Sequence, residues 1–381
     1  MRILFHYESM ALGGQQTHLY NLLRELPPRC EVHLAYNNPG DFLDVMATAA
    51  PCHALGVPLR HREYQRRPWR VAQAAWRLDG VVRRIGAGAL VTGSGVGSIW
   101  GGLVARARRI PHARVVGGAP SQIEARLYAN YKRLCVDRLI DRYFGWEAVF
   151  QELEAVGVSR SKMTETPPAV DGSLFRPPTP EERREARRAL GLPDDVMVIG
   201  WSGRIAENMQ VKWTVAMAAE LARRGRVPVH LLLVGGGDWV EELTRRVADA
   251  GLSDRTTFLG WRPYLEMPRL YGAMDVVPLL SEDPQGGSIL REAMACGRAV
   301  MTVDGPSGAQ REFVRHLENG ILFGVTEFTT VAADWAERLW DDRELSAALG
   351  DGAAAYAHAE MSFARVAGIV ADWAEGAAGR P

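Results

Sequence analysis

The sequence predicts an α/β fold of two doubly wound parallel sheets, because strand-like and helix-like segments alternate twice along the chain. In the first half we place strands at residues 2–6, 31–36, 89–92 and 113–116, and helices at 15–26, 69–85 and 99–108. A proline-rich stretch at 175–180 can continue neither element, and we interpret it as a linker. In sheets of this kind, ligands bind at the carboxyl ends of the strands.

The alternation starts again beyond the linker. We place strands at 196–201, 229–234, 257–259, 276–280 and 299–303, and helices at 211–223, 239–250 and 267–273. A chain of 381 residues exceeds the usual size of one hydrophobic core, so we expect two Rossmann-like domains facing each other across a cleft, at 1–180 and 181–359. The tail at 345–375 has a helical pattern, and we expect the segment at about 360–381 to pack back on the first domain.

The composition is that of a globular protein, with 47% hydrophobic and 24% charged residues. A formal net charge of zero argues against a nucleic-acid binder, whose affinity rests on accumulated positive charge. We find neither a membrane-spanning apolar run nor a signal peptide pattern, and we expect a cytoplasmic protein. The cysteines are scattered, which predicts neither a zinc site nor a disulfide framework; they are Cys30, Cys52, Cys135 and Cys296.

One segment departs from this even charge. Between residues 60 and 84 the basic residues are Arg60, Arg62, Arg66, Arg67, Arg70, Arg77, Arg83 and Arg84. Trp69 and Trp76 lie seven positions apart and therefore on one face of a helix. Such a surface could contact an anionic membrane peripherally, at its inner face, or a phosphorylated acceptor. The alternative interpretation, which the sequence alone favours, is a solvated helix whose tryptophans lie in the core.

The most informative motif is the segment 281–297, which follows a predicted strand and opens a short helix. Its paired glycines, Gly286 and Gly287, allow backbone N–H groups to approach a ligand closely, and the helix that begins near Ser288 offers unpaired amides and a positive dipole end to a phosphate. Glu292 follows one turn later, where its carboxylate can accept hydrogen bonds from the hydroxyls of a ribose. The motif therefore predicts a nucleoside diphosphate site.

Six motifs, in order across residues 190–325, resemble those of retaining GT-B glycosyltransferases of glycosyltransferase family 4, also described as glycosyl transferases group 1. They are GWSGR at 200–204, LVGGG at 233–237, FLGW at 258–261, YGAMD at 271–275, EAMACG at 292–297, and EFV followed by ENG between 312 and 320. The first half is similar less specifically, through 12–19 and 168–177. The resemblance implies the GT-B fold.

The resemblance also implies a donor site. Its cations are an arginine, matched by Arg204, and a lysine about six residues later; position 210 is Gln here, so we assign that role to Lys212. The implied donor-binding residues are Gly13, Gly14, Gly203, Gly260, Trp261, Arg262, Gly286, Gly287, Ser288, Ile289 and Glu292. For Gly13 and Gly14, which follow the first strand, a glycine turn without ligand contact is the alternative.

The chain departs from the family pattern at two places. The first family glutamate falls on Pro284, so we consider Glu282 and Asp283 as carboxylates that reach the donor sugar, the alternative being a solvated acidic turn. The family histidine is missing after the strand at 113–116. The candidate sugar or acceptor contacts that remain are Gly117, Gly118 and Ser121, with His6 and His18 as further candidates.

These residues and the resemblance together imply a retaining transferase that moves a sugar from a nucleotide diphosphate, which we expect to be UDP, to a hydroxyl of a small-molecule or glycan acceptor. The departing β-phosphate takes the acceptor's proton, so no protein nucleophile is needed. Arginine and helix amides already supply positive charge, and we expect neither a metal nor a further cofactor. Two alternatives stay open: a degenerate nucleotide-sugar-binding subunit that regulates a partner transferase, and an epimerase acting on UDP-sugars.

Overall fold

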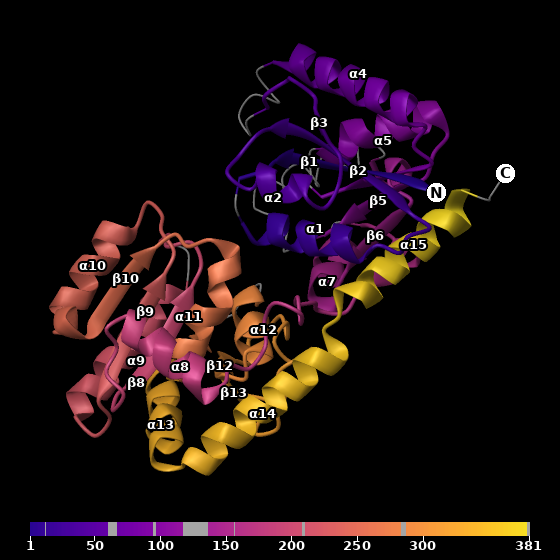
Figure 1. Cartoon of the computed structure of the whole chain (residues 1–381). Coiled ribbons are helices and arrows are strands. Elements are labelled where there is room, and N and C mark those ends of the chain that lie inside the picture. Colours follow the sequence, from indigo (N-terminus) through magenta and orange to yellow (C-terminus); the bar gives the residue numbers. More distant parts are fainter. Residues whose placement is uncertain are drawn as a thin grey trace. The chain divides into compact units, whose positions relative to one another are not determined.

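The computed structural model describes the whole chain except residues 12, 60–66, 94–96, 117–135, 156, 208–209, 283–286 and 379–381. It divides into two compact units (Figure 1): unit 1 is Met1–Pro167 with Phe363–Pro381, and unit 2 is Pro168–Ser362. The boundary expected at residue 180 therefore lies earlier. The proline-rich stretch belongs to unit 2 because Phe175 is fully buried there, with its ring against those of Tyr264 and Tyr271.

Unit 1 contains a seven-stranded parallel sheet of order β3-β2-β1-β4-β5-β6-β7. The strands are β1 (Arg2–Ser9), β2 (Glu31–Asn38), β3 (Cys52–Ala54), β4 (Ala89–Thr92), β5 (His112–Val115), β6 (Arg142–Gly145) and β7 (Met163–Glu165). The α-helices are α1 (Gly14–Glu25), α2 (Leu43–Ala47), α4 (Pro68–Ile85), α5 (Gly97–Arg108), α7 (Glu147–Ala155) and α15 (Phe363–Ala378), with 3-10 turns at Val136–Leu139 and Arg160–Lys162. Helix α15, from the end of the chain, packs against α1.

Unit 2 contains a six-stranded parallel sheet of order β10-β9-β8-β11-β12-β13. The strands are β8 (Met197–Ser202), β9 (Val229–Val234), β10 (Thr256–Gly260), β11 (Val276–Leu279), β12 (Ala299–Val303) and β13 (Ile321–Phe323). The α-helices are α8 (Pro180–Ala189), α9 (Val211–Arg224), α10 (Val240–Asp249), α11 (Met267–Ala273), α12 (Ser288–Ala295), α13 (Phe328–Asp341) and α14 (Arg343–Glu360), with 3-10 turns at Ser253–Arg255 and Tyr264–Glu266. The helical tail consists of two helices, α14 and α15, which agrees with the helical pattern expected at 345–375.

The strand order fixes where a ligand can bind in each unit. In unit 2 the chain runs from β8 outward through β9 to β10 and then returns to β11, on the other side of β8. The loops after β8 and β11 therefore leave the sheet in opposite directions and open a crevice at the carboxyl ends of these strands. In unit 1 the same reversal lies between β1 and β4.

A buried ion pair ties the first helix of unit 2 to its sheet. Thr179 and Glu182 form a capping box that starts α8, with Pro180 in the first turn. From this helix Arg183 and Arg187 donate to the carboxylate of Asp275, which also accepts a 2.7 Å hydrogen bond from the backbone N–H of Val198. The side chain of Arg187 is only 6% exposed. Asp275 therefore fixes α8 against the amino ends of β8 and β11.

We predict that Asp275→Asn lowers the free energy of unfolding of unit 2 by about 3 kcal/mol, because it leaves the buried guanidinium of Arg187 and the half-buried one of Arg183 without their counter-charge. Urea unfolding of the full chain measures the loss. The matched control is Glu181→Gln, which removes the exposed ion pair with Arg184 on the same helix and should change stability by less than about 1 kcal/mol. Equal unfolding midpoints for the two variants would contradict the assignment.

Candidate functional site

A chain of hydrogen bonds connects three elements at the crevice of unit 2. Ser202 ends β8, and its hydroxyl lies 2.5 Å from the hydroxyl of Tyr271 in α11. The Tyr271 hydroxyl in turn donates to Oε2 of Glu292, in α12, at 2.8 Å. Tyr271 is completely buried, so its ring cannot swing away without disturbing the core. Glu292, the residue predicted to bind the ribose, is therefore held in position through Tyr271 by the strand that leads to Arg204.

Burial raises the pKa of Glu292 to about 7, although the Tyr271 hydrogen bond and the guanidinium of Arg291 both favour the ionised form. The neighbouring Arg291 is itself buried, which lowers its pKa, while Glu292 and Glu312 act in the opposite direction. The Glu292 carboxyl therefore changes charge near neutral pH. Hydrogen bonds from ligand hydroxyls would stabilise its ionised form.

The loop after β8 is packed backbone to backbone against the loop after β9. A Cβ atom at Gly235 would lie 1.8 Å from the carbonyl oxygen of Gly203, and one at Gly237 would lie 2.1 Å from that of Ile205. The two loops also exchange hydrogen bonds, from Gly203 N–H to Val234 O at 3.0 Å and from Ile205 N–H to Gly236 O at 2.9 Å. Only glycine permits this contact, which fixes the backbone on both sides of Arg204.

Arg204 extends from this fixed loop into solvent. Its side chain is exposed, and its guanidinium makes no hydrogen bond or ion pair with any residue that the structure describes. Lys212, in the first turn of α9, bends back toward the same loop and donates to the carbonyl of Glu207 at 3.4 Å. Its ammonium also lies 5.5 Å from the ring centre of Trp213. The two predicted cations thus belong to one loop and the helix that follows it.

The predicted phosphate-binding turn opens α12. Gly287 is the N-cap residue, with φ of 122°, and no side chain caps the helix. The first amides of α12 are therefore available to an anion. Ser288 is exposed, whereas Ile289 is 6% exposed and belongs to the core. Glu282 is exposed as well, and Asp283 and Gly286 lie outside the described residues.

The third loop of unit 2 carries the residues predicted near the nucleotide base. Gly260 ends β10, and its carbonyl accepts a 2.8 Å hydrogen bond from the N–H of Gly235. Trp261 follows with 54% of its surface exposed and with its indole beside Gly236, and Arg262 is exposed. The loops after β8, β9 and β10 are therefore in mutual contact at the carboxyl edge of the sheet.

Of the residues predicted to form the site in unit 1, the structure describes Gly13 and Gly14 but not those after β5. Gly13 is the N-cap residue of α1, which no side chain caps; its carbonyl accepts from the N–H groups of Gln16 and Thr17, and Gly14 begins the helix. Its φ of −178° is extended backbone, so the geometry does not require glycine. Gly117, Gly118 and Ser121 lie outside the described residues.

Neither histidine candidate is placed as a ligand contact. His6 is fully buried: Nε2 lies 2.9 Å from Oδ1 of Asn37, and the ring packs edge to face on Trp100. Burial lowers the pKa of His6 to about 4, so its imidazole is neutral and structural, which corrects the proposal that it contacts a sugar. His18 of α1 packs against Phe363 of α15, with ring centres 5.0 Å apart.

The residues that support Glu292 were not predicted from the sequence. Tyr271 lay within a quoted motif, but its role depends on α11 and α12 being adjacent, which the motif does not show. Ser202 and Arg291 were likewise assigned no role. A signal was present for Tyr271, since the helix is apolar apart from Arg269 and a buried tyrosine usually finds a hydrogen-bond partner.

Comparison with known proteins finds similarity to glycosyltransferases. The family model described as "Glycosyl transferases group 1" matches residues 182–355. The D-inositol 3-phosphate glycosyltransferase of Stackebrandtia nassauensis is 35% identical over 193 residues, which are 47% of this chain and 40% of that protein. The 2-deoxystreptamine glucosyltransferase of Streptomyces kanamyceticus is 34% identical over 146 residues, 38% of this chain and 37% of that protein. The chain thus spans well under half the length of these relatives.

A solved structure extends the likeness over the whole chain. Anabaena HepE, crystallised with UDP and glucose, superposes with a TM-score of 0.82 and covers 99% of this chain and 100% of its own, at 21% identity. At that identity the likeness shows the fold. The predicted GT-B fold of two parallel-sheet units is therefore confirmed.

We predict that Glu292→Gln stabilises the protein near pH 8 by about 2 to 3 kcal/mol and has little effect near pH 4. The folded-state pKa of about 7 lies above the ordinary value of 4.5, so the folded chain binds this proton more tightly than the unfolded chain does. The charge of Glu292 therefore lowers the stability of the wild-type protein. This loss is absent below pH 4.5, the ordinary pKa, and is complete above the folded-state pKa of about 7. Glutamine keeps an oxygen for Tyr271 and carries no charge.

Urea unfolding of both proteins at the two pH values measures the difference, with Glu181→Gln as an exposed control that should show no such pH dependence. A stability gain of equal size at both pH values would show that the Glu292 charge is not its source.

Proposed function

We propose that this chain, whose residues 182–355 belong to the glycosyl transferases group 1 family, transfers a sugar from a nucleoside diphosphate to a hydroxyl acceptor. The observation that carries the proposal is the convergence, at the crevice of unit 2, of the fixed carboxylate of Glu292, the uncapped amides of α12 and the unpaired guanidinium of Arg204. The first suits ribose hydroxyls, and the other two suit a diphosphate.

Each residue then has a role in breaking the anomeric bond. As the bond from the anomeric carbon to the β-phosphate oxygen breaks, negative charge grows on the diphosphate; Arg204, Lys212 and the amides at Ser288 stabilise it. The acceptor oxygen forms the new bond on the same face, and its proton passes to the departing phosphate. The configuration is retained without a protein nucleophile or a metal. Glu282, the last described residue before the gap at 283–286, contacts the donor sugar in this scheme.

The comparisons support the choice of substrates. HepE, whose fold this chain shares, was crystallised with UDP and glucose, which supports UDP as the nucleotide. In this scheme the base lies near Gly260 and Trp261. Both curated relatives are named for cyclitol acceptors, D-inositol 3-phosphate and 2-deoxystreptamine, and we propose a cyclitol acceptor here. The named activities of these relatives do not favour the alternative of a degenerate regulatory subunit.

We predict that Arg204→Ala lowers kcat by about 100- to 1,000-fold, because the leaving group loses one of its two proposed cations. UDP release from UDP-glucose, with 2-deoxystreptamine or D-inositol 3-phosphate as acceptor, measures the loss. Arg204→Lys should recover part of it. The matched control is Arg188→Ala, an exposed arginine of α8. Because Arg204 is exposed and unpaired, its removal should leave the thermal midpoint unchanged.

Undiminished turnover in Arg204→Ala would remove Arg204 from the site. A wild-type protein that binds UDP but turns over none of the donors tested, UDP-, GDP- and dTDP-sugars, would support the regulatory subunit instead.

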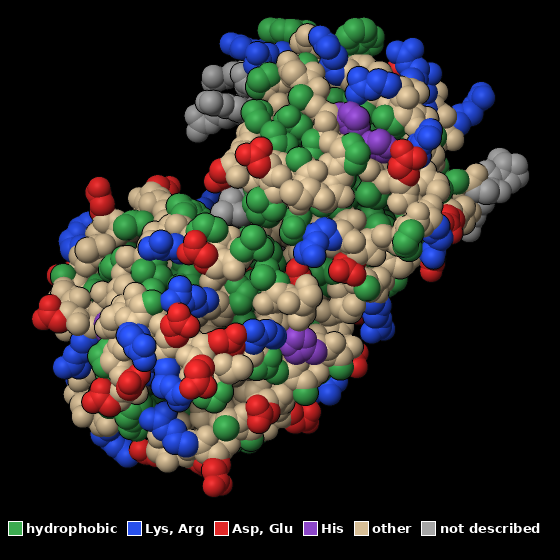
Figure 2. Space-filling view, viewed as in Figure 1, with side chains coloured by type: hydrophobic (Ala, Val, Ile, Leu, Met, Phe, Trp, Pro, Cys, Tyr) green, Lys and Arg blue, Asp and Glu red, His purple; other side chains and the backbone are tan. Residues whose placement is uncertain are grey.

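We also propose that helix α4 of unit 1 makes a peripheral contact with an anionic membrane. Trp69 and Trp76 are 64% and 63% exposed, so the interpretation that places them in the core is wrong. The buried face of α4 is formed instead by Ala74, Leu78, Val81, Val82 and Ile85. Figure 2 shows hydrophobic and basic side chains projecting together along the edge of the molecule over α4. No described helix has the length and apolar character of a membrane span.

The charges on α4 suit an anionic surface. The described basic residues are Arg67, Arg70, Arg77, Arg83 and Arg84, and the guanidinium of Arg77 lies 5.4 Å from the ring centre of Trp76. The single acidic residue of the helix, Asp79, is paired with Arg108 and Arg83. Each arginine near an anionic surface contributes about 1 kcal/mol, and indole rings prefer the level of the lipid headgroups. Residues 60–66 of the arginine-rich segment lie outside the described residues.

We predict that the double variant Trp69→Ser with Trp76→Ser lowers partitioning onto phosphatidylserine-containing vesicles at least about tenfold, because two indoles no longer enter the headgroup layer. Vesicle sedimentation measures the bound fraction. Leu103→Ser, at a residue of α5 that is 56% exposed, is the matched control. Binding that is equal for both variants, or equal on purely zwitterionic vesicles, would contradict the proposal.

A further inference from the structure

A cavity lies in unit 1, at the end of the sheet opposite the carboxyl edge. It measures about 600 Å³, within the range of small-molecule sites. Its walls are the segment Arg109 to Pro111 before β5, the start of β6 at Asp141 and Arg142, Thr164 of β7, and the last turns of α15. All strands of this sheet are parallel, so the cavity lies near the amino ends of β5 and β6, away from the crevice after β1.

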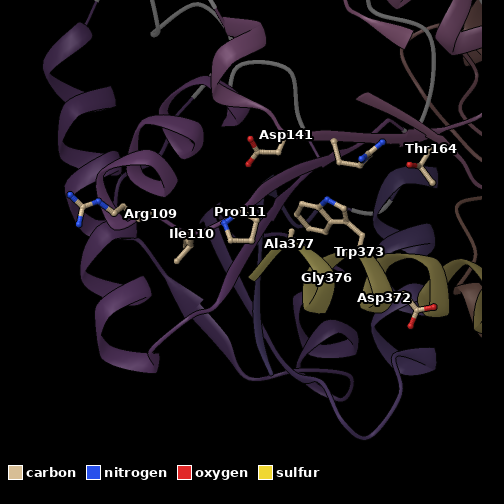
Figure 3. A pocket seen from close by; sticks show the side chains of 10 residues that line it. Arg109, Ile110, Pro111, Asp141, Thr164, Asp372, Trp373, Gly376 and Ala377 are labelled. Atoms are coloured by element: carbon tan, nitrogen blue, oxygen red, sulfur yellow. The ribbon is translucent and has the colours of Figure 1, made fainter. Parts of the chain in front are cut away.

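The floor of the cavity is an indole ring. Trp373 projects from α15 into the cavity, with Pro111 and Asp141 on one side of the ring and Thr164 on the other (Figure 3). Its orientation is fixed by an edge-to-face contact with the buried ring of Phe144, at 5.6 Å between centres and 82° between planes. No described residue accepts a hydrogen bond from its N–H.

Three polar side chains around this ring, those of Asp141, Arg142 and Thr164, can form hydrogen bonds with a ligand. Asp141 is tied to the start of β5 in both directions: its N–H donates to the carbonyl of His112 at 2.8 Å, and its Oδ2 accepts from the N–H of His112 at 2.9 Å. Its second oxygen, Oδ1, is left for a ligand. Arg142 donates through Nη1 to the carbonyl of Ser161, which leaves its other N–H groups. The hydroxyl of Thr164 can donate or accept.

This set of groups discriminates between classes of ligand. The lining carries four charged side chains, Arg109, Arg142, Asp141 and Asp372, which sum to no net charge. Asp372 is already paired with Arg29, so an anion would meet Asp141 and a cation would meet Arg142. An apolar ligand would leave the carboxylate, the hydroxyl and the indole N–H without partners. A neutral ring that carries several hydroxyls satisfies all of them, because each hydroxyl both donates and accepts, while its C–H face packs on the indole.

We propose that this cavity, which we call the Trp373 cavity, binds a neutral saccharide ring that stacks on Trp373 and hydrogen-bonds to Asp141, Arg142 and Thr164. The site is separate from the donor crevice and requires none of its residues. The two side chains that define it are held before the ligand arrives, by Phe144 and by the backbone of His112, so little conformational freedom is lost on binding.

Saturation-transfer NMR on the full chain tests the proposal, with excess UDP present to occupy unit 2. The probes are the methyl glycosides of glucose, galactose, mannose and N-acetylglucosamine, and maltose. At least one probe should bind to the wild-type chain. Asp141→Asn, which keeps an oxygen for the His112 N–H, should weaken binding about tenfold or more, because a neutral amide replaces a charged acceptor.

Two further variants guard against misfolding as an explanation. Trp373→Phe keeps an aromatic ring against Phe144 but removes the N–H and part of the platform, and Thr164→Val keeps the shape of threonine. Both should weaken binding while the unfolding midpoint stays near that of wild type. The matched controls are Trp76→Phe, at an exposed tryptophan of the same unit, and Arg204→Ala, in the donor crevice; neither should change saccharide binding.

The proposal is overturned if no probe binds to the wild-type chain, or if Asp141→Asn binds as tightly as wild type. It is also overturned if inorganic phosphate displaces the saccharide, since the cavity would then be an anion site. Loss of saccharide binding in Arg204→Ala would place the saccharide in the donor crevice, which would sink this inference and leave the transferase proposal standing.

Discussion

The chain of hydrogen bonds from Ser202 through Tyr271 to Glu292 is the constraint on which the candidate donor site depends. It joins the end of β8 to α11 and α12, and its central hydroxyl has no exposed surface through which water could compete. The first turn of α12 is thereby fixed relative to the strand that leads to Arg204. In the proposed reaction, a diphosphate that binds between them meets helix amides whose positions the core has set, and an arginine whose backbone is fixed by the packed loops.

Placing the Glu292 carboxylate at this position costs free energy of folding. A carboxylate buried beside a tyrosine is less stable ionised than it is in water, as the raised pKa of Glu292 shows. Arg291 offsets part of that cost, yet its own burial lowers its pKa and so limits the benefit. Hydrogen bonds from ligand hydroxyls would lower the unfavourable free energy of the ionised Glu292 carboxylate that remains. An uncharged side chain at this position would therefore give a more stable fold at neutral pH and above.

Most of the fold could be predicted from the sequence, and the failures have physical causes. Apolar segments located β1, β2, β4 and β5 and the main strands of unit 2. β3 and β7 have three residues each, too few for any periodicity, and β6 is a four-residue strand that begins with Arg142; all three are held by hydrogen bonds to neighbouring strands. In the site, Arg204 and the turn before Ser288 follow from local sequence. Tyr271 does not, because its partner is reached only after two helices have packed.

Helix α4 shows how a correct pattern can still leave a surface undetermined. Trp69 and Leu78 are nine residues apart, or about two and a half turns, and therefore point to opposite sides of the helix. The helix thus has two apolar stripes, and only one can face the sheet. The stripe through Ala74, Leu78 and Ile85 is buried because its small and branched side chains run along the helix and pack closely against the core of unit 1. The two indoles are left on the solvent side among arginines, and the proposed membrane contact rests on this exposure rather than on their spacing.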